Sequence, residues 1–448
     1  MTKPTGTPGP SRPSIVWFRQ DLRLSDNPAL TAAVVRGGPV VPVYIWAPEE
    51  EGEWPPGAAS KWWLGRSLAA LSAELEKRGS RLIVRRGPTE EAMARLVAET
   101  GAGAVFLNRR YEFVASGRDG QVLTSLRDRG LVAEGFNGSL LFEPWAVANA
   151  VGKPFRVFTA YWRACMRLPI ARQSPDAPRR LRPPESWPSS LAIADLQLEL
   201  SIDRANGFCE VWQPGEAGAR GQLKRFLADA AEYEVNRDRP DIFGTSRLSP
   251  HLHFGEIGPG QIWRAAPASQ AFLRQLIWRE FAYHLMFHFP ESEQQPLRAQ
   301  FAKFPWKFDA AKFAAWKRGE TGYPLVDAGM RELWRTGWMH NRVRMVVASF
   351  LVKHLLIDWR DGAAWFWDTL VDADLANNTL GWQWVAGCGA DAAPYFRIFN
   401  PAIQAAKFDP EGEYVRRWAP DSVELTPIVD HDEARRHALA ALARIRKK

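Results

Sequence analysis

The feature that most constrains the fold is a change of hydrophobic period partway along the chain. Up to about residue 142, short apolar runs alternate with amphipathic stretches of helical length, whereas beyond about residue 216 a 3.6-residue period continues almost throughout. The apolar runs predict buried strands of a parallel sheet at residues 14–18, 40–46, 81–85 and 104–108. This pattern predicts an N-terminal doubly wound α/β domain followed by an all-α C-terminal domain.

The predicted helices of the first domain lie between its strands, at residues 60–79, 89–100 and 118–130. We expect Ser60 to cap the first of them and Gly79 to end it. The clearest helical periods of the C-terminal half lie at residues 270–289, 329–357 and 433–448. The first of these places Gln275, Trp278 and Arg279 on one stripe.

Composition suggests where the domains begin and end. Residues 1–13 predict a short disordered tail, and residues 14–144 make up the predicted α/β domain. Residues 145–215 are rich in Pro and Arg, which predicts a long connector lying over the surface. Residues 216–448 then form the predicted helical domain.

The charge balance is compatible with a polyanionic partner. Lysine and arginine number 58 against 50 acidic residues, so the formal net charge is +8 and the pI is about 9.5. A basic surface speeds the encounter with polyanions, although a merely basic soluble protein would carry the same charge.

Several classes of protein are disfavoured. No apolar run approaches the roughly 18–20 residues that cross a membrane, and the first residues lack the apolar segment of a secretory signal. Cys165, Cys209 and Cys388 are far apart, which argues against structural disulfides and against zinc or iron–sulfur sites. We therefore expect a cytoplasmic protein, with a monomer as the default.

The usual dinucleotide-binding signature is missing from the α/β domain. The first predicted strand is followed by residues 17–27, WFRQDLRLSDN, and not by a glycine-rich turn. Gly387, Gly389 and Ala392 match GxGxxA, but they follow a Trp-rich segment and no strand, so we reject this match.

Two short segments have the chemistry of a ligand site. In TSRLSP (245–250), Ser249 before Pro250 predicts a helix N-cap, and the preceding hydroxyls with Arg247 could hold a phosphate. An ordinary capped helix would look the same. In WMHNRVRM (338–345), Asn341 and Arg344 share a face with Met345, which suits a pocket or the edge of an amphipathic helix.

A third segment, residues 372–384, combines Asp372, Asp374 and Asn378 with two tryptophans. No histidine or third acid joins the two acids, so a metal site is not expected. A buried acid usually needs a cationic partner, and Arg344 is the expected partner of Asp372.

These segments together resemble the DNA photolyase/cryptochrome family, and most closely its cyclobutane pyrimidine dimer photolyases. The landmarks are WFRQDLRLSDNPAL (17–30), GTSRLSPHLHFGEI (244–257), IWREF (277–281), TGYPLVDAGMREL (321–333), GWMHNRVRM (337–345) and the segment from 372 to 401. They occur in the family's order and cover nearly the whole chain. The resemblance implies an α/β antenna domain and a helical domain that binds FAD.

The resemblance also assigns cofactor residues. The residues implied to hold the FAD phosphates and the adjoining flavin parts are Tyr233, Thr245, Ser246, Arg247, Leu248 and Ser249. Those implied to surround the rest are Arg279, Asn341, Arg344, Asp372, Asp374 and Asn378, the last of which would face flavin N5. The implied electron relay consists of Trp382, Trp359 and Trp306, which could also be simple packing residues. The α/β domain could hold a second antenna chromophore (a folate, a deazaflavin or another flavin) or none, because antenna sites vary within the family.

The implied substrate is UV-damaged DNA with a flipped-out lesion. Trp278 and Trp384 would be the walls of the lesion pocket, and Asn341 and Met345 would touch the lesion. The candidate contacts to DNA phosphates are Arg342, Arg397 and Lys407. Each could instead be an ordinary solvated surface charge, and for Lys407 this alternative is favoured. Gln275 stands where cyclobutane-dimer photolyases usually have Glu.

The implied activity is light-driven splitting of cyclobutane pyrimidine dimers by an electron from photoexcited, reduced FAD, formally a carbon–carbon lyase reaction. Three alternatives stay open: a cryptochrome-like blue-light receptor, a (6-4) photolyase and a generic flavin electron-transfer protein. The (6-4) alternative rests on Gln275, because a glutamine at this position is a feature of the (6-4) photolyases. Only about 28 residues follow Pro420, which disfavours the long signalling extension that cryptochromes often have.

Overall fold

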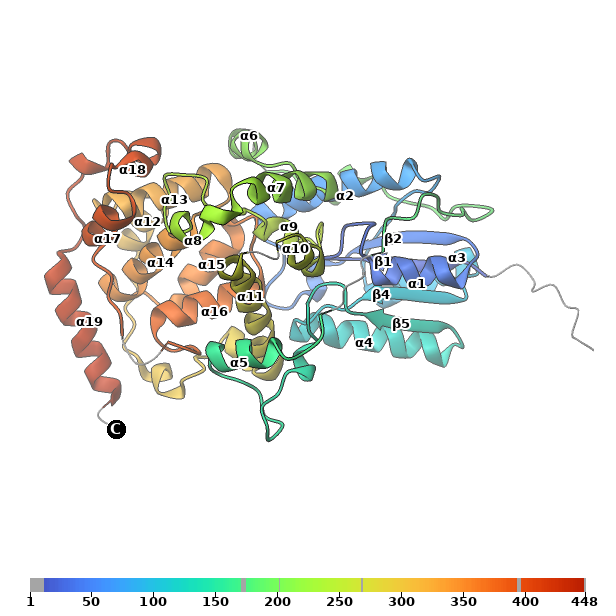
Figure 1. Ribbon diagram of the computed structural model, residues 1–448, viewed down its shortest axis with the longest axis horizontal. Coiled ribbons are helices and arrows are strands. Elements are labelled where there is room, and N and C mark those ends of the chain that lie inside the picture. Colours follow the sequence, from blue (N-terminus) through green and yellow to red (C-terminus); the bar gives the residue numbers. More distant parts are fainter. Residues whose placement is uncertain (1–11, 171–174, 201, 267–268, 393–395, 447–448) are drawn as a thin grey trace, which may run out of the picture.

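The computed structural model describes residues 12–170, 175–200, 202–266, 269–392 and 396–446. The predicted tail at residues 1–13 therefore lies almost entirely outside the described residues. Figure 1 shows the α/β part at one end of the molecule and the helical part at the other, with the C-terminal helix on the far side of the helical part.

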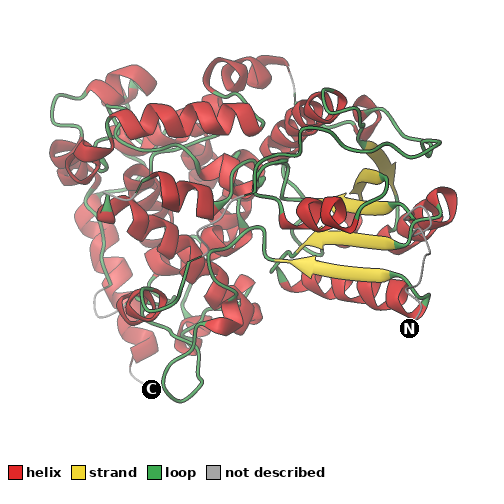
Figure 2. Cartoon of the chain, turned by 45° about the vertical axis from the view of Figure 1, so that its right-hand side comes forward, coloured by secondary structure: helices red, strands yellow, loops and turns green. Residues whose placement is uncertain are grey.

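The N-terminal part is a parallel sheet covered by helices (Figure 2). Its strands are β1 (Ser14–Phe18), β2 (Val40–Trp46), β3 (Ile83–Arg86), β4 (Ala104–Asn108) and β5 (Val132–Phe136). The order is β3-β2-β1-β4-β5, and every neighbouring pair is parallel. The doubly wound α/β prediction is confirmed. β5 was not predicted, because VAEGF is partly exposed and contains a Glu and a Gly in place of a continuous apolar run.

The helices of this part are α1 (Pro28–Arg36), α2 (Ala58–Glu76), α3 (Thr89–Thr100) and α4 (Phe113–Asp128). The prediction for α3 is confirmed, whereas α4 begins five residues earlier than predicted. The expected N-cap at Ser60 is wrong: α2 begins at Ala58, and Ser60 is buried inside it. Asp368 of the helical part accepts a 2.9 Å hydrogen bond from the Ala58 backbone, so a tertiary contact defines this helix start.

The C-terminal part is helical, as predicted. Its longer helices are α7 (Glu216–Ala228), α11 (Gln270–His288), α12 (Ala310–Arg318), α13 (Pro324–Thr336), α14 (Asn341–Ser349), α15 (Trp359–Thr369), α16 (Leu375–Ala386), α17 (Pro401–Phe408) and α19 (His431–Arg446). The shorter ones are α8 (Tyr233–Asn236), α9 (Ser249–His253), α10 (Pro259–Ala265) and α18 (Glu413–Trp418). The largest apolar core lies among α13, α14, α15 and α16.

The helical period noted over residues 329–357 is divided between separate helices, because the chain breaks between α13 and α14. Gly337 has a φ of +68°, and a Cβ there would come within 2.6–2.7 Å of Phe208 and Val371. α14 then restarts with His340 as its N-cap and runs into a π-helical turn, η7 (Phe350–His354).

The segment between the two parts contains structure that its composition did not predict. It includes α5 (Phe158–Cys165) and α6 (Ile202–Val211). Phe158, Tyr161 and Cys165 are buried against α11, and Phe208 is buried in the core beside β1 and β2. Figure 1 shows α5 alongside α11. Within the described part of the chain, no helix has the length and apolar character needed to cross a membrane.

Candidate functional site

The predicted ion pair between α14 and the start of α16 is present. Arg344 Nη2 lies 3.0 and 2.9 Å from the two carboxylate oxygens of Asp372, and Arg344 Nε donates to the Met339 carbonyl at 2.7 Å. The Asp372 side chain is only 4% exposed. The pair therefore holds a charged, oriented guanidinium beside the N-terminus of α16.

Asp374 has both carboxylate oxygens occupied within the protein. One accepts from the backbone and side-chain nitrogens of Asn377, at 2.9 and 2.6 Å, and the other accepts from the Tyr283 hydroxyl. Burial alone would raise the pKa of Asp374, but nearby His253, with its Nδ1 3.8 Å away, and Arg279 hold this pKa well below its usual range. Asp374 is thus an anionic N-cap that fixes α16.

Asn378 lies one turn into α16. Its side-chain nitrogen donates to the Ala363 carbonyl at 3.0 Å, which orients the amide. An amide nitrogen has two N–H groups and its oxygen can accept, so one N–H and the oxygen are left for a ligand.

The predicted phosphate-binding segment has an unusual arginine. Arg247 has a φ of +50°, and its guanidinium lies over the rings of Phe243 and Trp338 at 4.7 and 4.6 Å. Among the described residues, Arg247 forms no salt bridge, and burial lowers its pKa. Glu332 opposes this lowering of the pKa. A strained backbone and a half-buried guanidinium outside any salt bridge are both typical of a binding site.

Ser249 does not cap α9, so that prediction is wrong. Leu248 is the N-cap and makes no side-chain capping bond, while the Ser249 hydroxyl accepts from Trp338 Nε1 at 3.4 Å. Tyr233 and Leu248 are buried in an apolar cluster of the same region, whereas Thr245 and Ser246 are half-buried beside Arg247.

The α11 stripe faces the connector segment. Trp278 stacks on Phe158 with ring centroids 3.6 Å apart and an interplanar angle of 5°. Gln275 donates to the Ala271 carbonyl at 3.2 Å, and Arg279 donates to the Ser139 carbonyl at 2.8 Å. One face of the Trp278 indole, which is the predicted wall of the lesion site, is therefore already covered by the Phe158 ring.

The α14 residues differ in how available they are. Asn341 is exposed and lies 3.9 Å from the Met345 sulfur. Arg342 is engaged within the protein, because it pairs with Asp238 at 2.8 Å and lies 4.3 Å from the Phe408 ring.

Trp384 and Arg397 line one small cavity together with Lys353. The buried Lys353 ammonium donates to the Arg397 carbonyl and lies 4.5 Å from the Phe396 ring. Burial lowers the pKa of Lys353 to about 7. The Arg397 side chain is exposed, as is Lys407.

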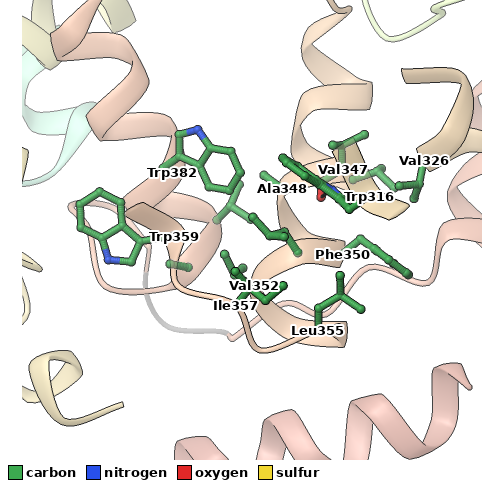
Figure 3. Close-up of a cluster of buried hydrophobic side chains, with 14 of the residues drawn as sticks. Trp316, Val326, Val347, Ala348, Phe350, Val352, Leu355, Ile357, Trp359 and Trp382 are labelled. Carbon is green, nitrogen blue, oxygen red and sulfur yellow. Dashed lines mark hydrogen bonds between the residues drawn. The ribbon is translucent and has the colours of Figure 1, made fainter. Parts of the chain in front are cut away.

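The three tryptophans of the predicted relay gather around one core. Trp382 and Trp359 are each 2% exposed within the large apolar cluster (Figure 3). The partly exposed Trp306 packs against the edge of this cluster. A Cβ at Gly362 would lie 2.1 Å from the Trp382 ring, so this close approach requires glycine. Trp316 lies edge-on to Trp382 at 6.4 Å.

A larger cavity, of about 300 Å³, opens between the sheet and the helical part. Trp17 on its wall has the guanidinium of Arg19 4.1 Å from its ring. Trp54 and Trp367 face it as an edge-to-face pair at 5.5 Å. The arginines on this wall are already paired with Asp119 and Glu51, so the aromatic walls suit a flat ligand without indicating its charge.

Sequence reasoning missed Phe158, Trp338 and Lys353. Phe158 lies in a Pro- and Arg-rich region, where its FTAYWRAC setting was the available signal of an amphipathic helix. Trp338 and Lys353 lie inside the helical period over residues 329–357, but neither has a local pattern that reveals its three-dimensional neighbours.

Comparison with known proteins places the chain in a family. Residues 272–426 match the FAD binding domain of DNA photolyase, and residues 14–180 match the DNA photolyase family. The chain belongs to the DNA photolyase/cryptochrome family.

Individual relatives refine this placement. The chain is 48% identical to a deoxyribodipyrimidine photo-lyase of Agrobacterium fabrum, covering 97% of this chain and 98% of the relative. It is 42% identical to cryptochrome-1 of Arabidopsis thaliana, covering 91% and 63%. The crystal structure of a class III photolyase from Agrobacterium tumefaciens superposes with a TM-score of 0.94, at 45% identity and full coverage of both chains.

The residues present fit FAD. Arg247 supplies a half-buried guanidinium that forms no salt bridge among the described residues, and neighbouring hydroxyls supply donors, which suits a diphosphate. Arg344 and Asn378 supply charge and hydrogen bonds, which suit the polar edge of a flavin ring. Among the described residues, no cluster of three or more His, Cys, Asp or Glu side chains could hold a metal.

Proposed function

We propose that this protein is a deoxyribodipyrimidine photo-lyase that repairs cyclobutane pyrimidine dimers in UV-damaged DNA. The observation that carries the proposal is the combination, in one helical domain, of a flavin-type polar set with an aromatic, arginine-rimmed surface. The polar set is Arg247, Arg344 and Asn378, and the surface includes Trp278, Trp384 and the exposed Arg397. A relative at 48% identity that is itself a deoxyribodipyrimidine photo-lyase supports it.

Bound FAD would supply the light-absorbing electron donor. On the protein side, Thr245, Ser246 and Arg247 would hold the diphosphate, with Tyr233, Leu248 and Ser249 shaping that end. Arg344 and Asp372 would present a fixed charge pair to the ring. Asn378, oriented by Ala363, would hydrogen-bond at N5 and hold the proton there.

The lesion would be bound by base flipping, since a damaged dipyrimidine is poorly stacked and less costly to extrude. Trp278 and Trp384 would supply apolar walls, with Asn341, Met345 and Gln275 against the lesion. Arg397 is best placed to contact a phosphate, because it is exposed. Arg342 would contact phosphate only by leaving Asp238, to which it is paired. The electron returns after the ring bonds split, so no net oxidation occurs.

The oxidised flavin would be photoreduced by electrons that pass from the protein surface through Trp306, Trp359 and Trp382. Indoles can pass a hole in short steps, and the three lie within or against one apolar cluster. Such a relay prepares the enzyme and is not needed in each repair turnover.

We also propose that the cavity between sheet and helices takes the second chromophore. Trp17, Trp54 and Trp367 would stack on a flat ring system. Denaturing the purified protein should then release a second chromophore besides FAD. The Trp54→Ala variant should lose that second chromophore and keep its FAD.

We propose further that the protein acts as a monomer in the cytoplasm, in keeping with three unpaired cysteines. Light scattering of the purified protein would test the oligomeric state. Fractionation of the native cells would test the location.

The deciding experiment is repair of a synthetic thymine-dimer oligonucleotide under near-UV light by the photoreduced protein, with a dark control and a matched (6-4) oligonucleotide. We expect light-dependent recovery of thymine absorbance for the cyclobutane dimer only. Repair of the (6-4) oligonucleotide would reassign the substrate. Photoreduction without any repair would favour the photoreceptor function that the 42% identity to cryptochrome-1 also allows.

A further inference from the structure

The connector helix α5 contacts Trp278, the proposed wall of the lesion site, through the side chain of Phe158. Phe158 is 1% exposed, and its ring lies parallel to that of Trp278 at 3.6 Å and 5°. The Arg274 guanidinium, one turn before Trp278 on α11, lies 5.3 Å from the same Phe158 ring. Phe158 therefore sits between two α11 side chains spaced i and i+4, which are neighbours on a helix surface.

α5 is held in this register by contacts farther along α11. Tyr161 packs on Phe281 and His284, with ring centroids at 5.2 and 4.8 Å. The Phe155 backbone donates to His284 Nε2 at 3.0 Å. These contacts fix the helix that carries Phe158, so the Phe158 ring is not free to leave Trp278.

We propose that Phe158 is a positioning residue of the repair reaction, which acts by fixing the indole plane of Trp278 against the flipped lesion. The proposal rests on the lesion-binding role of Trp278 proposed above. Phe158 covers one face of the indole and the Phe281 ring lies edge-to-face with it at 5.9 Å, while Trp278 as a whole is only half-buried, so the accessible part of the indole is what a base could stack on. An indole held in one orientation loses less conformational freedom when a base stacks on it, which strengthens binding of the damaged site.

The size of the effect follows from the energy of an aromatic pair. Such pairs are worth enough to change an equilibrium about three- to tenfold. Phe158→Leu keeps an apolar side chain but removes the ring face, so we expect about three- to tenfold weaker binding of a thymine-dimer oligonucleotide in the dark. Affinity for the undamaged oligonucleotide should not change. Phe158→Tyr keeps the ring and should restore dimer affinity.

The matched control is Trp145→Leu, which removes a different aromatic contact between the connector and α11, the one with the Phe287 ring at 5.4 Å. It should leave the ratio of damaged to undamaged affinity at the parent value. Phe158→Met is a second variant without an aromatic ring, for use if Phe158→Leu does not yield flavin-loaded protein. Methionine suits this position because its flexible side chain fills irregular space.

A double-mutant cycle separates this inference from the proposed function. In a Trp278→Ala background, Phe158→Leu should produce no further loss of dimer affinity, because its effect passes through Trp278. Parent-like dimer affinity in either ring-free variant, or an equal loss in Trp145→Leu, would overturn the role of Phe158. If Trp278→Ala alone binds the dimer as tightly as the parent, the lesion role of Trp278 fails, and the role of Phe158 fails with it.

Discussion

Arg344 and Asp372 form a two-pronged ion pair, in which one guanidinium nitrogen lies within 3.0 Å of both carboxylate oxygens. Because the Asp372 side chain is 4% exposed, removing its partner leaves a buried charge uncompensated. We expect Arg344→Met to lower the free energy of unfolding by about 2–3 kcal/mol, somewhat less than for a fully buried pair, since Arg344 is 23% exposed. Urea unfolding and the bound FAD per protein would be measured.

The control for this variant is Arg335→Met. Arg335 pairs with Glu210 at the surface, where ion pairs contribute little. Equal destabilisation by the two substitutions would show that the Arg344–Asp372 pair has no special weight.

The tryptophan relay predicts a separation of two activities. Trp359→Phe should slow photoreduction of oxidised FAD severely, because phenylalanine is much harder to oxidise than indole. Once reduced chemically, the variant should still repair the thymine-dimer oligonucleotide. Absorbance changes under blue light and a repair assay with dithionite-reduced protein would follow the two steps.

Trp62→Phe, in the core of the α/β part, serves as the relay control and should photoreduce normally. Parent-like photoreduction in Trp359→Phe would contradict the relay. It would mean that the hole leaves Trp382 through another neighbour, of which Trp316 is the nearest tryptophan in ring contact.

Glu332 predicts a pH dependence of stability. Burial raises its pKa to about 7 from 4.5, although the Tyr414 hydroxyl and Arg247 oppose this shift. The folded state therefore favours the protonated acid, whose contribution is complete below about pH 4.5 and is lost as the pH rises through 7. Glu332→Gln keeps a neutral acceptor for Tyr414 and should be more stable than the parent at pH 8 by about 3 kcal/mol, with no gain near pH 4.5.

Urea unfolding of the FAD-loaded protein at both pH values would measure this difference. Glu424→Gln, at an exposed position, should leave the pH dependence unchanged. The same advantage of Glu332→Gln at pH 4.5 and pH 8 would argue against a raised pKa.

The two candidate DNA arginines should behave differently. Arg397 is exposed, so Arg397→Ala should weaken the binding of damaged and undamaged DNA equally. It should also reduce the slope of log affinity against log salt concentration by about 0.9. Arg342 is tied to Asp238 and Phe408, so Arg342→Ala should lower protein stability and change the salt slope less. Fluorescence anisotropy across a salt series would decide, and identical slopes for the two variants would refute the distinction.

Much of the fold follows from local periodicity. The strands at residues 14–18, 40–46 and 104–108 and the helix at residues 89–100 coincide with the structure, because a buried parallel strand is a continuous apolar run and an amphipathic helix repeats every 3.6 residues. The Arg344–Asp372 pair was also predictable, since few partners exist for an acid in an apolar segment. The FAD-binding domain was recognisable from residue types at fixed positions.

Tertiary contacts decided the rest. The break at Gly337 depends on Phe208 and Val371, and the start of α2 depends on Asp368, none of which is a sequence neighbour. Whether Arg342 is free or paired depends in the same way on Asp238.

The sequence by itself determined the two-domain class, the sheet, and the residue types for flavin and DNA chemistry, because these are properties of local pattern. Only the tertiary structure decided that the connector folds into α5 and lays Phe158 flat on Trp278. The physical reason is that a stacking contact between distant segments depends on how two helices dock, and docking sums many weak contacts that no local period encodes.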